Sequence, residues 1–253
     1  MAIALKPMEQ FEIHRIGPPM HVFGYDISFT NQALFMFIVV AAVTLVLTLA
    51  MSRRRLVPSR AQSMAEVSYE FVAGMIRSTS GDEGMVFFPF VFTIFMFVLF
   101  SNFLGLIPGA FTVTSQIVVT FALAATVMLT VIIVGFARHG LGFFKLFVPK
   151  APFYLLILLV PIEVISFLTR LVSLSVRLFA NMLAGHTMLA VFAGFVVALG
   201  AAGGILSALS IAPLFFIVAI MMLELLVAFL QAYVFAILTC IYLNEALHLH
   251  DHH

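Results

Sequence analysis

The sequence contains no tryptophan, one cysteine, and charged residues at only 9% of its 253 positions. A soluble domain usually has about 25% charged residues, so this scarcity, together with 64% hydrophobic residues, indicates a polytopic membrane protein. The net charge of +1 argues against a nucleic-acid partner, which would need a basic surface. Cys240 is alone, which excludes an internal disulfide, and it lies in an apolar run where it packs as a small residue.

The sequence also has no internal repeat and no polar linker that would divide it. Residues 1–30 are mixed and polar, and the first apolar run begins near residue 33. A signal peptide would have a basic start and an early, short apolar core. We therefore expect no signal peptide and one membrane domain over residues 1–253.

Three apolar runs have about the 20 residues that a membrane-spanning helix needs; they cover residues 31–51, 84–106 and 116–137. Basic residues follow the first run (Ser52-Arg-Arg-Arg55, Arg60) and the third (Arg138, His139, Lys145, Lys150). Lysine and arginine mark cytoplasmic loops, so we expect residues 1–30 to lie outside, in the periplasm of a bacterium.

Residues 61–79 differ from these runs because polar residues interrupt them. Met64, Val67, Phe71 and Ile76 are interpreted as one apolar face of an amphipathic helix at the cytoplasmic interface. An ordinary cytoplasmic connector helix is the alternative.

Two longer apolar runs, residues 152–197 and 204–247, exceed the length of a simple span. The first would be about 65 Å long as a helix, whereas a bilayer core is about 30 Å thick. Each run is either two short helices with a re-entrant turn or one long inclined helix. Because glycine and asparagine are few inside both, we favour two long, strongly tilted helices joined near residues 200–204. The fold class is thus an all-α polytopic membrane protein with about five membrane-embedded helices and one interfacial helix.

Polar side chains recur at steps of three or four residues along the first long run; they are Glu163, Ser166, Arg170, Ser173, Arg177 and Asn181. This spacing keeps one face of an α-helix. A charge such as Arg177 costs at least about 2.5–3.5 kcal/mol at the bilayer centre. Arg177 lies too far from either end of the run to reach water, so a functional role is favoured over a structural ion pair.

The two long helices should be antiparallel, and counting then predicts their register. If Gln231 is level with Arg177, Glu224 lies about 10 Å and His186 about 13 Å to the outer side. Glu163 lies about 21 Å to the inner side. Histidine titrates near physiological pH, and intramembrane polar chains mark proton routes. Since arginine does not release its proton, Arg177 is interpreted as a barrier between two access routes.

Such a barrier needs a carrier that takes protons around it. Glu163 and Glu224 lie on the two flanks and Glu245 lies at the end of the chain, so no carboxylate is spare. We therefore expect the carrier on a partner. Asn102 and Gln116, near the outer ends of their helices, either form local hydrogen bonds or line an aqueous entrance.

Three stretches together resemble subunit a of F-type ATP synthases. They are Ser173-Leu-Ser-Val-Arg177-Leu-Phe-Ala-Asn181-Met-Leu-Ala-Gly185-His186, then Glu224 with Leu230-Gln231-Ala-Tyr-Val-Phe235, and the turn Asn102-Phe-Leu-Gly-Leu-Ile-Pro108. The resemblance covers roughly residues 10–247. It implies that the long helices lie almost in the membrane plane against a c-ring, whose carboxylate is the missing carrier. It also implies that the chain assembles with peripheral-stalk b-type subunits and with the rest of the rotary ATP synthase. The implied location is the bacterial inner membrane, with the mitochondrial inner membrane as second choice. The resemblance implies no cofactor and no metal.

The resemblance assigns Arg177 to attracting the deprotonated c-ring carboxylate and blocking a short circuit. Gln231 would lie beside it and Asn181 one turn away, within the motif that begins at Ser173.

The remaining assignments concern two half-channels. His186 and Glu224 would line the outer one, supported by Asn102 and Gln116. Glu163, with Ser166 and either Tyr233 or Tyr242, would line the inner one. Many bacterial members have glutamate and histidine in the opposite order, so the pair is expected to act as a unit.

Two alternative functions are a stand-alone proton or ion transporter and an intramembrane metalloenzyme. A stand-alone proton or ion transporter would need inverted repeats or broken helices, which the sequence lacks. A metalloenzyme would have to use His248, His250, His252 and His253 at the terminus, where a solvated tail is the simpler interpretation. No Gly-x-x-x-x-Gly-Lys loop occurs, so nucleotide chemistry is expected on other subunits. The sequence does not decide whether H⁺ or Na⁺ is the transported ion, because the partner carboxylate selects it.

Overall fold

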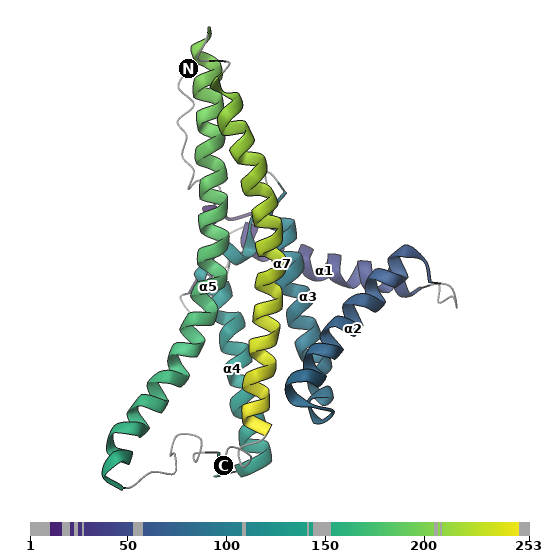
Figure 1. Cartoon of the computed structure of the whole chain (residues 1–253), viewed down its shortest axis with the longest axis vertical. Helices are drawn as coiled ribbons and strands as arrows, with labels where there is room; N and C mark the ends of the chain where they lie inside the picture. Colours follow the sequence, from purple (N-terminus) through teal and green to yellow (C-terminus); the bar gives the residue numbers. More distant parts are fainter. Residues whose placement is uncertain are drawn as a thin grey trace. The chain divides into compact units, whose positions relative to one another are not determined.

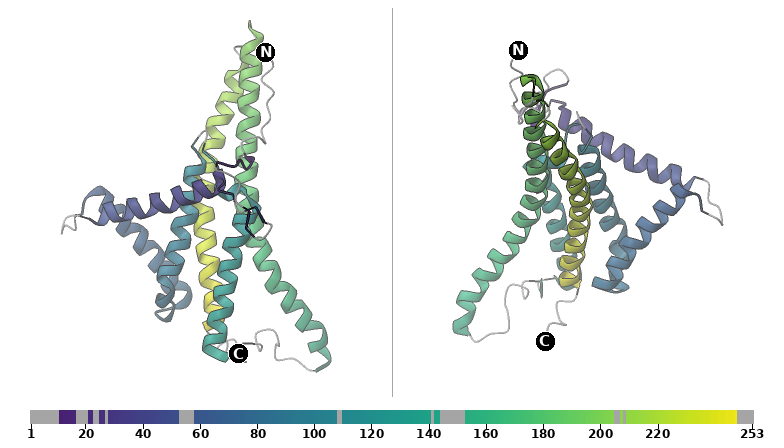
Figure 2. Two further views of the ribbon diagram at one scale, coloured as in Figure 1. Left: turned by 180° about the vertical axis from the view of Figure 1, so that it is seen from behind. Right: turned by 45° about the horizontal axis from the view of Figure 1, so that its top comes forward.

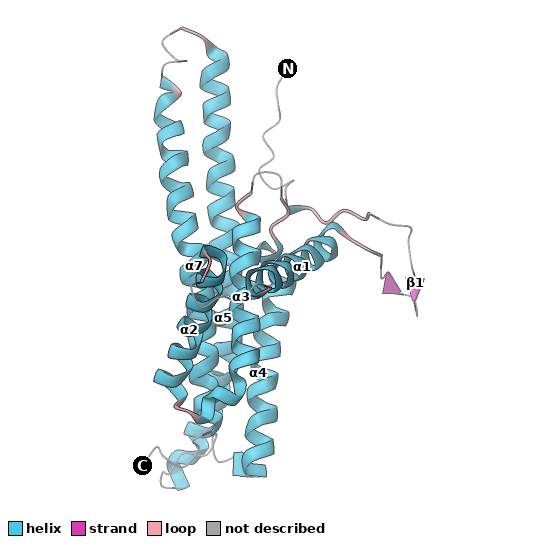
Figure 3. Ribbon diagram, turned by 90° about the vertical axis from the view of Figure 1, so that its right-hand side faces the viewer, coloured by secondary structure: helices cyan, strands magenta, loops and turns pink. Residues whose placement is uncertain are grey.

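The computed structural model describes residues 11–16, 21–22, 25–26, 28–52, 58–107, 110–140, 142–143, 153–204, 207 and 209–247. Within these residues the chain is almost entirely α-helical (Figure 3). The two strands in this part, β1 (His21–Val22) and β2 (Tyr25–Asp26), form one short antiparallel pair. The predicted Arg53–Arg55 cluster, Lys145, Lys150, the turn at Pro108 and the terminal histidines lie outside the described residues.

The described residues form six α-helices: α1 (Asn31–Met51), α2 (Arg60–Ser80), α3 (Phe88–Gly105), α4 (Ile117–His139), α5 (Phe153–Ala202) and α7 (Ile211–Leu247). Short 3-10 turns, η2 (Glu83–Phe87) and η3 (Val113–Ser115), precede α3 and α4. In the described part of the chain, five segments are long and apolar enough to cross a membrane, and α2 is not among them. The predicted all-α polytopic fold is confirmed.

Helix α2 is amphipathic, but one residue of its expected apolar face was assigned wrongly. Met64, Val67 and Phe71 are exposed together, whereas Ile76 is buried. A helix turns by about 100° per residue, which puts Ile76 on the side opposite Val67. The Ser59 hydroxyl caps the helix by accepting from the Gln62 N–H at 3.3 Å.

The two long runs are each one continuous helix, which excludes a re-entrant turn inside α5 or α7. Helix α5 has 50 residues and α7 has 37, or about 75 Å and about 55 Å. Neither can stand upright within an apolar layer about 30 Å thick. Helix α5 ends at Ala202 because Gly203 and Gly204 adopt φ values of 70° and 61°, which favour glycine.

The chain divides into two compact units, described separately below. Unit 1 comprises Met1–Leu45, Phe97–Gln116 and Leu178–Gln231, and unit 2 comprises Val46–Met96, Ile117–Arg177 and Ala232–His253. Helices α1, α3, α5 and α7 contribute to both. The expectation of one membrane domain stays a prediction.

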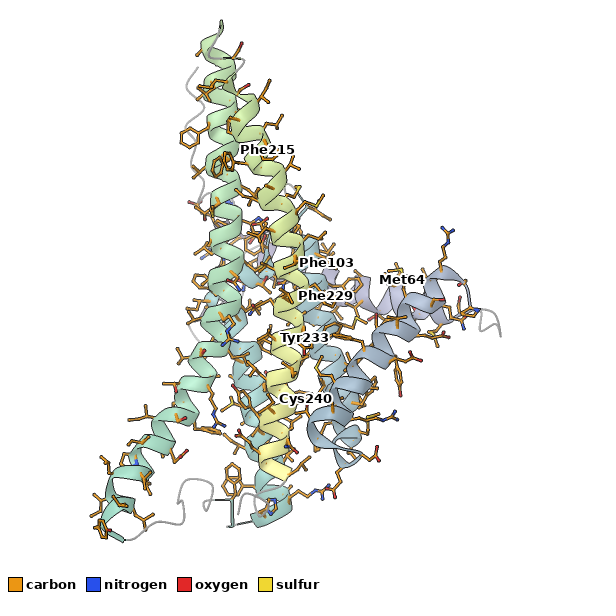
Figure 4. The ribbon with its side chains drawn as sticks, viewed as in Figure 1. Met64, Phe103, Phe215, Phe229, Tyr233 and Cys240 are labelled. Carbon is orange, nitrogen blue, oxygen red and sulfur yellow. The ribbon has the colours of Figure 1, made fainter. Side chains whose placement is uncertain are left out.

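In unit 1, the segments Leu178–Ala202 of α5 and Ile211–Gln231 of α7 run side by side (Figures 1 and 2). Phe192 stacks on Phe216 across them, with ring centroids 5.6 Å apart. Phe215 and Phe229 on α7 and Phe103 on α3 keep exposed rings (Figure 4). Exposed apolar side chains of this kind are expected of a protein that meets lipid or partner subunits.

In unit 2, polar contacts join helices that are far apart in the sequence. The Ser80 hydroxyl donates to the Cys240 carbonyl at 3.2 Å, and a ring nitrogen of His139 lies 3.2 Å from the Leu247 carbonyl oxygen. The Phe71 ring lies 5.7 Å from that of Tyr233. Cys240 is a buried packing residue of α7, as predicted (labelled in Figure 4).

Candidate functional site

Arg177 lies near the middle of α5 with its side chain exposed in the isolated chain. Its neighbours on the same helix face are small; Ser173, Ala180 and Ala184 are all exposed. No ion pair of Arg177 is present among the described residues. An apolar helix thus presents one unpaired cation on a face that another helix could approach closely.

The outer candidates come together within unit 1. His186 is half-buried, and its Nε2 atom lies 3.1 Å from the Thr112 hydroxyl. The Phe11 ring packs edge-on against the imidazole, with centroids 6.3 Å apart at 70°. Neither contact was predicted, because Thr112 and Phe11 lie outside the periodic helices.

Glu224 of α7 packs against Gly185, the residue next to His186. A Cβ atom on Gly185 would lie only 2.8 Å from the Glu224 Cδ atom, so glycine makes room for the carboxyl group. Oε2 of Glu224 is buried and has no hydrogen-bond partner in the described part of the chain. The Glu224 carboxyl group therefore packs against the residue of α5 that precedes His186. One of its oxygens is free to accept a proton.

A hydrogen bond between two side-chain amides also links α5 and α7 in unit 1. Nδ2 of Asn181 donates to Oε1 of Gln231 at 3.0 Å. Asn181 is exposed, whereas Gln231 is 4% exposed and its Nε2 atom is buried without a partner among the described residues. The resemblance gave both residues a place near Arg177; the structure adds that they bond to each other.

Asn102 and Gln116 form long-range hydrogen bonds instead of local ones. Nδ2 of Asn102 donates to the Ala228 carbonyl at 3.2 Å, and its Oδ1 accepts from the Thr114 hydroxyl at 2.9 Å. Asn102 is fully buried, and its hydrogen bond to Ala228 joins α3 to α7. Nε2 of Gln116 donates to the Phe11 carbonyl at 2.8 Å.

The inner candidates belong to unit 2. Arg170 forms an ion pair with Glu245, and its guanidinium carbon lies 5.5 Å from the centroid of the Tyr242 ring. Glu163 is half-buried, with no ion pair among the described residues. Sequence reasoning left Glu245 without a role, although Tyr242 and Glu245 are three residues apart on one helix face.

Another polar contact in unit 2 joins α5 to α4, outside the polar stripe that runs from Glu163 to Asn181. The hydroxyls of Ser175 and Thr120 lie 3.2 Å apart, and both residues are buried. Ser166 is half-buried on the same stripe. Within the described residues, no three His, Cys, Asp or Glu side chains are close enough to hold a metal.

Comparison with known proteins shows the family of the chain. The ATP synthase A chain family matches residues 33–244, which include all nine candidate residues from Asn102 to Gln231. The chain belongs to the ATP synthase A chain family. The resemblance drawn from the Arg177 and Gln231 motifs is therefore confirmed.

Three bacterial members of the family illustrate how completely the match extends. ATP synthase subunit a of Chelativorans sp. is 61% identical over 247 residues, which cover 97% of this chain and 99% of the relative. Its counterpart from Mesorhizobium japonicum is 60% identical over 243 residues, 96% of each chain. That of Pelagibacter ubique is 57% identical over 249 residues, 98% of this chain and all of the relative.

Proposed function

We propose that the chain is the proton-translocating stator subunit in the membrane sector of a rotary ATP synthase. Membership of the ATP synthase A chain family supports this role, since its relatives are named ATP synthase subunit a. The subunit itself catalyses no nucleotide chemistry, which is carried out by other subunits. Its part is to couple ion transport to ATP synthesis.

The exposed Arg177 is the observation that carries the proposal. An isolated guanidinium on an apolar face is costly unless an anion pairs with it. The small side chains of Ser173, Ala180 and Ala184 let a partner helix come close. A carboxylate on a rotating c-ring meets both requirements, because it arrives, pairs with the arginine and leaves.

The mechanism uses two half-channels. A proton enters from outside past Glu224 and His186 and neutralises a c-ring carboxylate, which can then face lipid because its desolvation cost has fallen. The ring turns until the site reaches the inner half-channel near Glu163, where the proton leaves. Arg177 holds only the charged form at the interface, so that proton transfer and rotation are coupled.

The Arg170–Glu245 pair extends the inner half of this scheme. It lies seven residues from Arg177 on the inner side of α5, or about 10 Å along the helix. Tyr242, which contacts Arg170, is favoured over Tyr233 as the tyrosine of this half-channel.

The remaining proposals concern placement in the cell. The chain lies in the bacterial inner membrane as one membrane domain, with its N-terminus periplasmic and its C-terminus cytoplasmic. Arg60 at the start of α2 and Arg138 in the last turn of α4 favour this orientation, since basic residues mark the cytoplasmic side. Helices α5 and α7 are inclined against the c-ring, α2 lies at the interface, and b-type subunits of the peripheral stalk bind the assembly.

The variant Arg177→Ala tests the proposal. ATP-driven proton pumping into inverted membrane vesicles should disappear, because nothing then prevents protons from passing directly between the half-channels. Ile157→Ala, another exposed position of α5 that is remote from the stripe, serves as the matched control. Pumping by Arg177→Ala at the control rate, with normal assembly, would refute the barrier role.

A further inference from the structure

We propose that the N-terminal segment 11–16, together with Thr112, is a positioning element for His186. The segment would hold the imidazole in one orientation and cover one side of it. This inference rests on the proposed function, in which His186 takes up protons from outside. It assigns a role in proton uptake to residues that no helix pattern singles out.

Thr112 fixes one ring nitrogen. Its hydroxyl lies 3.1 Å from Nε2 of His186 and donates to the Gly105 carbonyl at 3.4 Å. A hydroxyl has one proton to donate and two lone pairs to offer. With that proton directed to Gly105, the hydroxyl accepts from Nε2–H, which leaves Nδ1 as the nitrogen with a free lone pair.

The position of Thr112 is itself fixed by packing. The residue is 4% exposed. A Cβ atom on Gly105 would lie 2.7 Å from the Thr112 Cγ2 atom, so the threonine side chain fills the space that glycine leaves. The Thr112 hydroxyl therefore has a fixed position, from which it orients the His186 imidazole.

Phe11 supplies the second contact, and two anchors hold it. The first is the Gln116 amide, which donates to the Phe11 carbonyl at 2.8 Å. The second is Asn31 at the start of α1, whose Nδ2 donates to the Glu12 carbonyl at 3.1 Å and whose Oδ1 accepts from the His14 N–H at 3.1 Å. An anchored backbone places the aromatic ring edge-on against His186.

The two contacts together determine what His186 can do. A hydrogen bond at one nitrogen sets the tautomer and orientation of a histidine. Phe11 covers part of the ring and limits its contact with water. Glu224, across Gly185, is the carboxyl group that faces this turn of α5. The outer uptake site thus comprises a held imidazole and a neighbouring carboxyl, with the N-terminal segment as part of its wall.

Chemical labelling of His186 in membranes that contain the whole complex tests the contacts. Diethyl pyrocarbonate modifies accessible imidazole, and mass spectrometry measures its rate at each histidine. Phe11→Ala should raise the labelling rate of His186 several-fold and leave that of His14, which is exposed, unchanged. Phe29→Ala is the control, because Phe29 stacks on Phe37 instead. Equal His186 labelling in the wild type and Phe11→Ala would overturn the proposal.

Proton pumping tests the positioning. Thr112→Val keeps the shape but removes the hydroxyl, and should lower the pumping rate by about two- to tenfold, the effect of one neutral hydrogen bond. Thr112→Ser should restore it. Wild-type pumping by Thr112→Val would overturn the proposal, as would failure of Thr112→Ser to rescue a fully assembled complex.

A second variant and a labelling assay that is independent of transport distinguish failure of this proposal from failure of the proposed function. If Phe11→Ala does not assemble, Phe11→Leu keeps the apolar bulk and should give a smaller rise in His186 labelling; no rise would count against the contact. The labelling does not depend on transport, so it fails only if the contact is absent. Failure of the proposed function would instead appear as pumping by Arg177→Ala.

Discussion

The close approach of α5 and α7 at Gly185 can be tested by adding one methyl group. In Gly185→Ala the new Cβ atom would lie 2.8 Å from Cδ and 3.0 Å from Cγ of Glu224. Because the methylene carbon is crowded along with the carboxyl carbon, rotation about the last bond cannot relieve the clash. The Glu224 side chain has to adopt another rotamer and withdraw its carboxyl group from the turn that holds His186.

The expected effects on stability and on transport differ in size. Replacing glycine by alanine in a helix stabilises it by about 1 kcal/mol, whereas overpacking costs about 1–3 kcal/mol. The net change should lie between zero and about 2 kcal/mol of destabilisation. A displacement of about 1 Å at a reacting group can lower a rate about a hundredfold, so we expect proton pumping to fall by at least about tenfold.

Gly200→Ala is the matched control, because it lies on the same helix and its Cβ atom would have no neighbour within 4 Å. ATP-driven acidification of inverted vesicles, normalised to the amount of assembled complex, measures the difference. Gly200→Ala should pump like the wild type. If Gly185→Ala pumps equally well, Glu224 either does not occupy this place in the assembled complex or does not need it.

Two further predictions concern stability. Asn102→Leu should destabilise the protein by about 1–3 kcal/mol, because it leaves the Ala228 carbonyl and the Thr114 hydroxyl without this partner; an unchanged thermal melting midpoint would contradict these buried bonds. Replacing Arg170 or Glu245 by glutamine should each destabilise the protein, since the other half-buried charge loses its partner. The double replacement should show a coupling energy of about 0.5–3 kcal/mol in thermal melts, and strictly additive effects would speak against the ion pair.

The helices could be predicted well because hydropathy and helical period act over many residues. Their ends were less predictable, since single turn residues determine them. The first long run was expected to end at residue 197, yet α5 continues through Gly200 to Ala202. It ends where Gly203 and Gly204 adopt positive φ, and α7 begins only at Ile211.

The candidate site likewise has some contacts that the sequence predicts and others that it does not. Helical rise alone puts Glu224 and His186 at similar levels, and the structure places Glu224 against Gly185. Thr112 and Phe11 belong to a loop and to the N-terminal segment, where no period relates sequence position to space. Their roles depend on tertiary contacts, which a single sequence does not display.

The role of Glu245 could not be predicted for another reason. In the sequence it is only a carboxylate near the end of the chain, with no sign of its partner. Helices α5 and α7 are antiparallel and differ in length, so the end of α7 reaches back to Arg170. The spacing of Arg170 on the stripe already indicated that a cation there needed an acidic partner.

Cross-linking tests the central claim, that the Arg177 face of α5 meets a partner carboxylate. Ser173 is exposed one turn before Arg177, and the native Cys240 is buried and should not compete. With a second cysteine placed beside the c-ring carboxylate, Ser173→Cys should form a disulfide with the ring subunit on mild oxidation, whereas Phe37→Cys on the exposed side of α1 should not. Equal products from both variants, or none from Ser173→Cys in an assembled complex, would contradict the account.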